Sequence, residues 1–599
     1  MRGRLHFRSE KSGTARVFTH TGKFVGQGEL FIAPGKFPCV SFDSDATLRP
    51  FVSRRLFQCD FGGEILTLLG CKNDDRTILP DLIVSGRKRT STFKSVSILL
   101  AGVSDWMDNA GGFRIAEDEI SRSRLREHIR AEIVREKARD FRFESEEWVS
   151  IEQRGGGERV VRQSTVLTLT AVKGVLSTEE VVELAHKTRM LFSIILGFPI
   201  DIESIWDRPR NGARSEVYFV NTTKADDPFE YRQYCFTQSS ELFRENAWPR
   251  LLQSFYGESS SRILDIWSRM PGLLEGHGNW EQQILAHVSL VDRYSDQLSQ
   301  RHDVKFTTSE WKATRRRIKL AFRSSIEVDN ESQLLSAPAD PLLVDSISSQ
   351  IDELANTRLR TFRRRFEIAI RQTPRSVQKI VALSTNDFTH IKKIRDKVAH
   401  GDIPETRDGR NVTDEFRITG KLYVLLLYWC FRGLGFSDDA FTGFLTNSLS
   451  PIVQRASLDN LSLDRETQRY PFLQISSRRA YQSIRHARPG DGVVIAPARQ
   501  AGTYCLDRDL TKEVHKWTTK ASPDERLIEL FVANRVKQSE VSTVGYLTGA
   551  YVQYRGEAHL AYGICVVGPR DLTRPYDRLV SRDSTSGRWG SSELDGERR

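Results

Sequence analysis

The sequence predicts a multidomain protein in which an all-α helical region lies between two α+β regions. Its 599 residues are too many for a single hydrophobic core and indicate about three or four domains. Short apolar runs bounded by Gly, Pro or Asp dominate the first part, helical periodicity dominates the middle, and both patterns return after it. The predicted domains are 1–250 (α+β), 251–447 (helical bundle) and 448–580 (α+β), followed by a polar tail, 581–599, that is predicted to be disordered.

The N-terminal region is predicted to begin with buried β-strands. Its apolar runs are continuous, as in strands that are buried on both faces, and they are ELFIAPG, EILTLLG, DLIVSG and SVSILLAG. The charged stretch Glu117–Trp148 predicts a helix, or a helix followed by a strand, with one solvated face. Ser177 and Glu180 have the spacing of a capping box, which predicts a helix that runs to about Leu196 and ends at Gly197. This region contains no recognisable catalytic constellation.

The middle region is predicted to be an antiparallel helical bundle, because its amphipathic segments are joined by short loops. The predicted helices are Ser261–Met270, Trp280–Gln300, Thr308–Ser324, Asp340–Arg371, Ser376–Ala399 and Asp414–Leu434. The fourth of these is expected to break once within its length.

The C-terminal region is predicted to be an α+β domain that follows a linker, 448–468. Its clearest elements are a helix, SSRRAYQSIRHA, and a strand, VVIAPA. Two further apolar stretches are predicted to pair as a hairpin around Arg555, Gly556 and Glu557. The region resembles no family that we recognise, and target recognition is a candidate role for it.

Composition favours a polyanionic partner and a cytoplasmic protein with no membrane association. The formal net charge is +11 and the pI is near 9.2. The first residues, MRGRLHFRSEK, do not have the pattern of a signal peptide, and no apolar run is long enough to span a bilayer. The seven cysteines are scattered singly, so we expect reduced thiols and no metal site. No pattern indicates a cofactor.

The stretch Ile391–Pro404 carries the pattern with the clearest chemical meaning. Its apolar residues recur at helical spacing, and Gly401 with Pro404 predicts that the helix ends there. His400 therefore lies at the helix C-terminus, just over one turn after Arg395. Histidine can give or take a proton near neutral pH, and arginine grips a phosphate with two donors. Together they could cleave RNA without a metal, with His400 assisting the 2′-OH or the leaving 5′-oxygen and Arg395 holding the phosphate.

A group of basic residues lies close to this motif. Arg363, Arg364 and Arg365 stand in a segment whose only acidic residue is Glu367, and Lys393 lies on the motif helix itself. Such residues can bind a phosphate backbone, and nearby aromatic side chains can stack on unpaired bases. The candidates for stacking are Tyr294, Phe362 and Phe366. The alternative is a solvated helix face whose aromatic side chains lie in the core.

The motif also resembles a known family. Arg395, four residues and His400, with the polar Asp396 directly after the arginine, resemble the R-x4-6-H motif of HEPN domains. The upstream stretch Ser261–Leu298 resembles the opening helices of the HEPN domain of ApeA-type anti-phage proteins. Three segments resemble the ApeA N-terminal domain: ILTLLGCKND, SVSILLAGVSDWM and LFRENAWPRLLQSFYG. The resemblance covers roughly residues 1–447.

This resemblance implies an all-α HEPN fold and metal-independent endoribonuclease activity in antiviral defence. It also implies a homodimer or higher homo-oligomer that brings two Arg/His pairs to one cleft. Arg395, His400 and Asp396 carry over as site residues, and the family's acidic residue in an early helix has a candidate in Asp292, although Asp is shorter than Glu. RNA is the expected substrate, with tRNA as one candidate. A sensor or regulatory role is implied for the N-terminal region, and a phage-derived trigger is an expected partner.

Two other classes of function stay open. A non-catalytic RNA-binding sensor would bind RNA in a salt-sensitive way and leave its length unchanged. A scaffold whose helical bundle serves only dimerisation would have no affinity for RNA. In both cases the arginine and the histidine would serve a structural purpose, since such residues commonly satisfy the last carbonyls of a helix.

Overall fold

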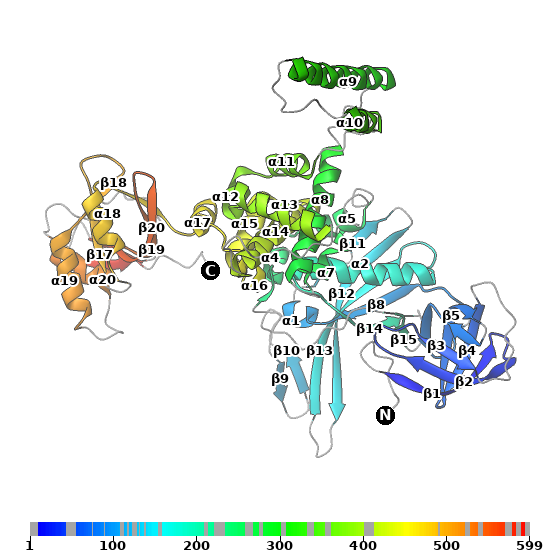
Figure 1. The fold of residues 1–599 in the computed structure, drawn as a ribbon. Helices are drawn as coiled ribbons and strands as arrows, with labels where there is room; N and C mark the ends of the chain where they lie inside the picture. Colours follow the sequence, from blue (N-terminus) through cyan, green and yellow to red (C-terminus); the bar gives the residue numbers. More distant parts are fainter. Residues whose placement is uncertain are drawn as a thin grey trace. The chain divides into compact units, whose positions relative to one another are not determined.

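The computed structural model of the chain contains two compact units, Met1–Asp459 and Asn460–Arg599. Both units contain helices and strands (Figure 1). The residues that the structure describes are 10–42, 55–74, 76–88, 90–107, 113–116, 119–122, 128–130, 132–136, 139–153, 159–208, 214–220, 234–257, 267–274, 280–300, 307–331, 341–353, 361–399, 412–488, 492–520, 527–536, 543–568, 578–582 and 589–592.

Six of the described strands form a closed antiparallel barrel at the start of the first unit (Figure 1, dark blue). They are β1 (Lys11–Thr19), β2 (Phe24–Ile32), β3 (Cys39–Phe42), β4 (Arg55–Phe61), β5 (Glu64–Asp74) and β6 (Thr77–Leu79). The order around the barrel is β1-β2-β3-β6-β5-β4. It closes because the long strand β5 pairs with β4 over most of its length and with β6 near its end.

A larger antiparallel sheet extends from the same strand β5 in the order β7-β15-β14-β8-β13-β12-β11. Its strands are β7 (Leu82–Ser85), β8 (Ser95–Leu100), β11 (Glu132–Arg135), β12 (Asp140–Gln153), β13 (Arg159–Ala171), β14 (Ile202–Asp207) and β15 (Ser215–Tyr218), while β9 (Phe113–Ala116) and β10 (Glu119–Arg122) form a separate pair. The helices of this region are α1 (Val103–Met107), α2 (Thr178–Leu196), α4 (Ser239–Arg244) and α5 (Trp248–Tyr256). Helix α2 contacts β8 and α5 contacts β11. The four apolar runs predicted as strands lie in β2, β5, β7 and β8, so this prediction is confirmed.

The charged stretch Glu117–Trp148 is not helical where the structure describes it. It forms β10, β11 and the first part of β12. Alternate residues of β12 are buried, as Phe141, Phe143 and Ser145 show, which is the period of two of a strand. The predicted helix was wrong, although the alternative that the stretch continues into a strand agrees with β12. The helix was predicted from sparse aliphatic residues, and no weight was given to this alternation.

Helix α2 has the two ends that the sequence predicts. The hydroxyl of Ser177 accepts a hydrogen bond from the backbone N–H of Glu180 at 3.2 Å, and the Glu180 carboxylate accepts one from the N–H of Ser177 at 2.6 Å. Gly197 ends the helix in the left-handed conformation with φ of 71°. A Cβ atom at this glycine would lie only 2.9 Å from the Cβ atom of Phe236.

Aromatic packing joins the N-terminal region to the helical region that follows it. The ring of Phe236 lies 5.2, 5.7 and 6.4 Å, between centroids, from the rings of Phe431, Phe441 and Phe444. Both regions belong to one compact unit, within which the predicted boundary between residues 250 and 251 falls.

In the second half of the first unit, all the elements that the structure describes are helices. Its helices are α7 (Met270–Leu274), α8 (Trp280–Gln300), α9 (Thr308–Glu331), α10 (Pro341–Glu353), α11 (Phe362–Gln372), α12 (Arg375–Val381), α13 (Thr385–Ala399), α14 (Val412–Gly433), α15 (Asp438–Asn447) and α16 (Pro451–Arg455). Every residue from 422 to 431 is buried, so α14 is central to this region. Among the described helices, none combines the length and the apolar character needed to cross a membrane.

The single helix predicted for Ser376–Ala399 is in fact two helices. Ala382 adopts a left-handed conformation with φ of 48° and ends α12, and the Lys421 ammonium donates to its carbonyl oxygen at 2.6 Å. Ser384 and Asp387 then cap α13 reciprocally, each accepting the backbone N–H of the other at 3.0 Å. This Ser-x-x-Asp spacing is the signal that the sequence analysis missed.

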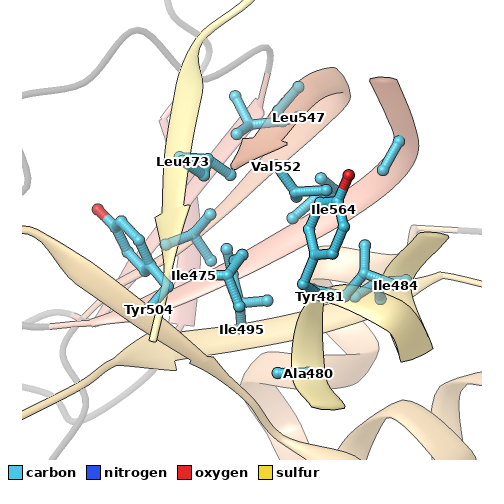
Figure 2. Close-up of a cluster of buried hydrophobic side chains, with 14 residues drawn as sticks. Leu473, Ile475, Ala480, Tyr481, Ile484, Ile495, Tyr504, Leu547, Val552 and Ile564 are labelled. Carbon is cyan, nitrogen blue, oxygen red and sulfur yellow. The ribbon is translucent and has the colours of Figure 1, made fainter. Parts of the chain in front are cut away.

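The second unit contains a small closed barrel of mixed strand directions. Its elements are α17 (Asn460–Glu466), β16 (Phe472–Ile475), α18 (Arg478–Arg485), β17 (Val493–Pro497), β18 (Thr503–Leu506), α19 (Arg508–Thr518), α20 (Ile528–Arg535), β19 (Thr543–Tyr554), β20 (Glu557–Gly568), β21 (Arg578–Arg582) and β22 (Trp589–Ser592). The order β16-β18-β17-β20-β19 closes on itself because β16 also pairs with β19. Figure 2 shows the core of this barrel, in which Tyr481 and Ile484 of α18 pack with strand residues such as Leu473 and Val552.

Some of the predictions for this unit agree with the structure and others do not. The hairpin is confirmed, since Tyr554 pairs with Glu557 and the two residues between them, Arg555 and Gly556, have φ of 47° and 89°, as in a type I′ turn. The predicted linker, 448–468, instead contains α16 and α17. Within the tail predicted to be disordered, 581–599, strand β22 pairs with β21.

Gly197 and Gly174 provide a matched test of the α2 cap. Both have φ near 70°, but a Cβ atom at Gly174 would meet no atom within 4 Å. We expect Gly174→Ala to lower the free energy of unfolding by about 1 kcal/mol through backbone strain. Gly197→Ala should lower it by about 1–3 kcal/mol more because its methyl group meets Phe236. Urea denaturation followed by tryptophan fluorescence measures both, and equal losses would contradict the packing argument.

His287 of α8 gives a prediction for pH. Burial lowers the pKa of this imidazole to about 4, from an ordinary value of 6.5. The unfolded chain binds this proton more readily, so the stability due to neutral His287 is complete above pH 6.5 and is lost as pH falls toward 4. We expect His287→Gln to lose less unfolding free energy than the wild type between these two pH values. The same pH slope in both proteins would refute the assignment.

Candidate functional site

Helix α8 presents two carboxylates on the side away from its buried face. Ile284, Val288 and Val291 are buried, and the ring of Tyr294 stacks on Trp429 of α14 with centroids 4.6 Å apart and planes 5° apart. This packing fixes the rotation of α8 about its own axis. Asp292 and Asp296, one turn apart, consequently face a cavity with the other helices of the bundle.

Asp292 is shared by two arginines that come from two other helices. The Nε and Nη2 atoms of Arg365 in α11 donate to its Oδ1 atom at 3.0 and 2.6 Å. The Nη2 atom of Arg395 in α13 donates to its Oδ2 atom at 3.5 Å. The side chains of Asp292 and Arg365 are 16% and 14% exposed, whereas that of Arg395 is 36% exposed. Arg365 is therefore the more deeply held of the two, and Arg395 is the more open to solvent.

A cluster of three phenylalanines holds α11 against α13. The rings of Phe366 and Phe388 stack with centroids 4.6 Å apart, and Phe362 lies 5.3 Å from Phe388. The guanidinium of Arg395 lies 5.6 Å from the centre of the Phe362 ring. All three rings are buried, as is Tyr294. Of the two alternatives for Tyr294, Phe362 and Phe366, the structure therefore favours the one in which their side chains lie in the core, where they help to position the arginines.

The cavity beside Asp292 has a volume of about 640 Å³. Its described lining includes residues from α7, α8, α11 and α13, and the charged ones are Arg269, Arg293, Arg365, Arg395, Asp292 and Asp296. Four guanidinium groups against two carboxylates favour an anionic ligand. Guanidinium groups bind a phosphate through two parallel hydrogen bonds, so a phosphodiester suits this lining in both charge and donor geometry.

Two of the three predicted catalytic residues, Arg395 and Asp396, lie in the C-terminal part of α13. The Asp396 carboxylate accepts hydrogen bonds from Lys392 at 2.8 Å and from Arg395 at 3.0 Å. These contacts, Lys392 first, hold the pKa of Asp396 below its ordinary value. Arg395 thus lies between two carboxylates, those of Asp292 and Asp396. His400 lies outside the described residues.

The four predicted RNA-binding residues do not share one surface. Arg365 points into the cavity, whereas Arg363 and Arg364 are exposed and each pairs with Glu367 at 3.2 Å. Lys393 is exposed on α13. Of this group the structure brings only Arg365 together with Arg395.

Two other histidines of the helical region have defined partners. His390 is half-buried, and its Nε2 atom lies 2.5 Å from Oε1 of the buried Glu415. His287 is buried, and its Nδ1 atom lies 2.7 Å from the backbone oxygen of Gln283. Among the described residues, no group of three or more His, Cys, Asp or Glu side chains could hold a metal ion.

Arg269, Arg293 and Asp296 belong to the cavity and were missed by the sequence analysis. Asp296 follows Asp292 by four residues, so both carboxylates lie on one helical stripe. That spacing could have identified Asp296. Nothing local marks Arg269, which precedes α7 and comes near only through the packing of the bundle.

Comparison with known families identifies part of the first unit. Residues 28–236 match the model of the family described as ApeA N-terminal domain 1. This part of the chain is similar to an ApeA N-terminal domain, which supports an ApeA-type protein and suggests anti-phage defence. The matched segment spans most of the closed barrel and the large sheet, and it ends before the helices that line the cavity. Comparisons with curated proteins and with solved structures gave no match.

Asp292→Asn tests the shared carboxylate. The substitution keeps the shape but removes the charge that the two guanidinium groups share, leaving Arg365 with Asp296 and Arg395 with Asp396. We therefore expect unfolding free energy to fall by about 1–3 kcal/mol. Glu367→Gln is the matched control, because it removes a carboxylate that two arginines contact at an exposed position. The control should change stability by less than about 1 kcal/mol. Equal effects in urea denaturation would show that Asp292 is no more important than a surface acid.

Proposed function

We propose that the chain is a metal-independent HEPN endoribonuclease of anti-phage defence, with its active site at the end of α13 beside the Asp292 cavity. One observation carries the proposal: Arg395, the arginine of the R-x4-6-H motif, shares Asp292 with Arg365 in a cavity that four arginines line. The ApeA N-terminal domain supports the defence context. The resemblance of Ser261–Leu298 to HEPN helices supports the fold assignment, since most of α8 lies within that stretch.

The arginines supply the means to hold RNA in this mechanism. Arg395, which is partly exposed, grips the scissile phosphate, and the more buried Arg365 stabilises the negative charge that grows on it. Asp292 keeps both guanidinium groups in the cavity, so little reorganisation is needed when the phosphate arrives. Asp396 acts as the second carboxylate that orients Arg395.

His400 supplies the proton transfers. In the sequence it follows Ala399, the last residue of α13 that the structure describes, and a helix C-terminus favours an imidazolium. The 2′-oxygen attacks phosphorus as its proton passes to a base, and the bond from phosphorus to the 5′-oxygen breaks as that oxygen takes up a proton. The products are a 2′,3′-cyclic phosphate and a free 5′-hydroxyl. His400 serves as the base for one transfer or the acid for the other, and a homodimer would bring two such histidines to one cleft. In this proposal the substrate is RNA, with tRNA as one candidate, and a phage-derived signal starts cleavage.

A non-catalytic RNA-binding sensor is the second candidate. The exposed Arg363 and Arg364 favour it, because they add phosphate contacts on a face separate from the cavity. The two candidates differ in whether bound RNA is shortened.

The decisive test is cleavage of total cellular RNA in EDTA, with and without extract from phage-infected cells. We expect fragments that end in 2′,3′-cyclic phosphate from the wild type and from Arg455→Ala, a control at an exposed arginine of α16. Arg395→Ala and His400→Ala should cleave at least about a hundredfold more slowly, because each removes one catalytic contribution. Thermal unfolding and size-exclusion chromatography should match the wild type.

Intact RNA in every sample, with infected-cell extract present, would reject the nuclease. Salt-sensitive binding under those conditions would favour the sensor instead. Cleavage that EDTA abolishes would contradict the proposed chemistry.

A further inference from the structure

The outer face of the small barrel in the second unit carries a row of aromatic residues. Strand register places Phe472 of β16 beside Tyr551 of β19, and Gly549 of β19 beside Tyr562 of β20. The residues that alternate with them, such as Leu473 and Val552, point into the barrel core (Figure 2). Phe472, Tyr551 and Tyr562 therefore belong to the outside of three neighbouring strands.

Tyr470 completes this group, which we call the aromatic platform (Tyr470, Phe472, Tyr551 and Tyr562). The rings of Phe472 and Tyr551 stack with centroids 4.9 Å apart and planes 8° apart, and Tyr470 lies 6.2 Å from Tyr551. A Cβ atom at Gly549 would lie 2.9 Å from the Tyr470 ring and 3.6 Å from the Tyr562 ring. The missing side chain of Gly549 thus lets both outer rings lie close to the strand.

A buried hydrogen bond between β19 and α17 holds the platform in place. The hydroxyl of Tyr551 donates to Oδ2 of Asp464 at 2.8 Å, and Asp464 is only 6% exposed. Burial, and then Asp464, raise the pKa of Tyr551, so it stays a neutral donor. At the other end Tyr562 is 45% exposed. A solvent-exposed aromatic side chain next to an ordered aromatic stack forms a surface that suits a flat ligand.

Two exposed arginines border the platform. The guanidinium of Arg465 lies 5.0 Å from the centre of the Phe472 ring, and that of Arg469 lies 5.4 Å from the Tyr470 ring. Both side chains reach solvent. Rings for stacking with cations beside them are the two components by which proteins bind single-stranded nucleic acids on small β-barrels.

We propose that the aromatic platform binds unpaired nucleotides of a single-stranded nucleic acid. Bases stack on Tyr562 and Tyr470, and backbone phosphates contact Arg465 and Arg469. Paired bases hide their faces in the duplex, so the platform discriminates against double strands. This site lies in a different unit from the Arg395 cavity and rests on none of the residues of the proposed nuclease.

The experiment uses the full chain with Arg395→Ala and His400→Ala as the parent, so that no cleavage occurs and the cavity is weakened. Fluorescence anisotropy measures binding of a labelled ten-nucleotide oligouridylate, its DNA counterpart and an RNA duplex of equal length. We expect Tyr562→Ala to weaken single-strand binding roughly fivefold to a hundredfold with an unchanged salt slope, and Tyr562→Phe to retain it. Arg465→Ala with Arg469→Ala should weaken binding and lower the salt slope by about one or two.

The control is Arg508→Ala with Lys512→Ala, which removes the same charge from the exposed face of α19 and should leave binding unchanged. Equal affinity for RNA and DNA single strands would show that the platform recognises only bases and phosphates. A preference for RNA would show that it also recognises the 2′-hydroxyl. Three results overturn the proposal: no binding by the parent, the same affinity in platform and control variants, or duplex binding as tight as single-strand binding. Each can be told from failure of the nuclease proposal, because the parent already lacks that activity.

Discussion

One carboxylate, that of Asp292, determines the geometry of the helical site. It joins α8 to Arg365, 73 residues further along the chain, and to Arg395, 103 residues further along. Two guanidinium groups brought to one cavity without a counter-charge would repel each other by several kcal/mol in a partly buried environment, roughly 4 kcal/mol at 4 Å. The Asp292 carboxylate offsets that repulsion and also fixes the orientation of each guanidinium group. The phenylalanine cluster behind it supplies the apolar burial that keeps α11 and α13 together.

The local part of this site could be predicted from sequence, and its long-range part could not. The helical spacing before Gly401 places Arg395 on α13, and the structure agrees. The choice among Arg363, Arg364 and Arg365 depends on rotation of α11. Its buried residues, Phe362, Phe366 and Ala369, define a stripe, and Arg365 lies about 40° from its edge while the other two point further away. The stripe is visible in the sequence, but the partner that Arg365 meets is not.

The same limit applies to the sheets. Continuous apolar runs gave the strands of the N-terminal region correctly. The charged stretch Glu117–Trp148 was predicted to be a helix, or a helix followed by a strand, because only its aromatic alternation marks β12 as a strand. The closure of the barrel could not be predicted from the sequence in either unit. β5 pairs with both β4 and β6, and β16 pairs with both β18 and β19, and such pairings depend on residues far apart in the chain. The break between α12 and α13, by contrast, was readable from Ser384 and Asp387.

The short strand β16 has a practical consequence for dissecting this protein. Its four residues, Phe472–Ile475, come early in the second unit, yet they pair on one side with β18 and on the other with β19. A shortened chain that starts after Ile475 would expose the edges of both partners. Unpaired strand edges recruit other chains, so such a fragment would tend to aggregate even with the rest of its core intact. A soluble fragment should instead start at or before Asn460, which also retains the Asp464 acceptor for Tyr551.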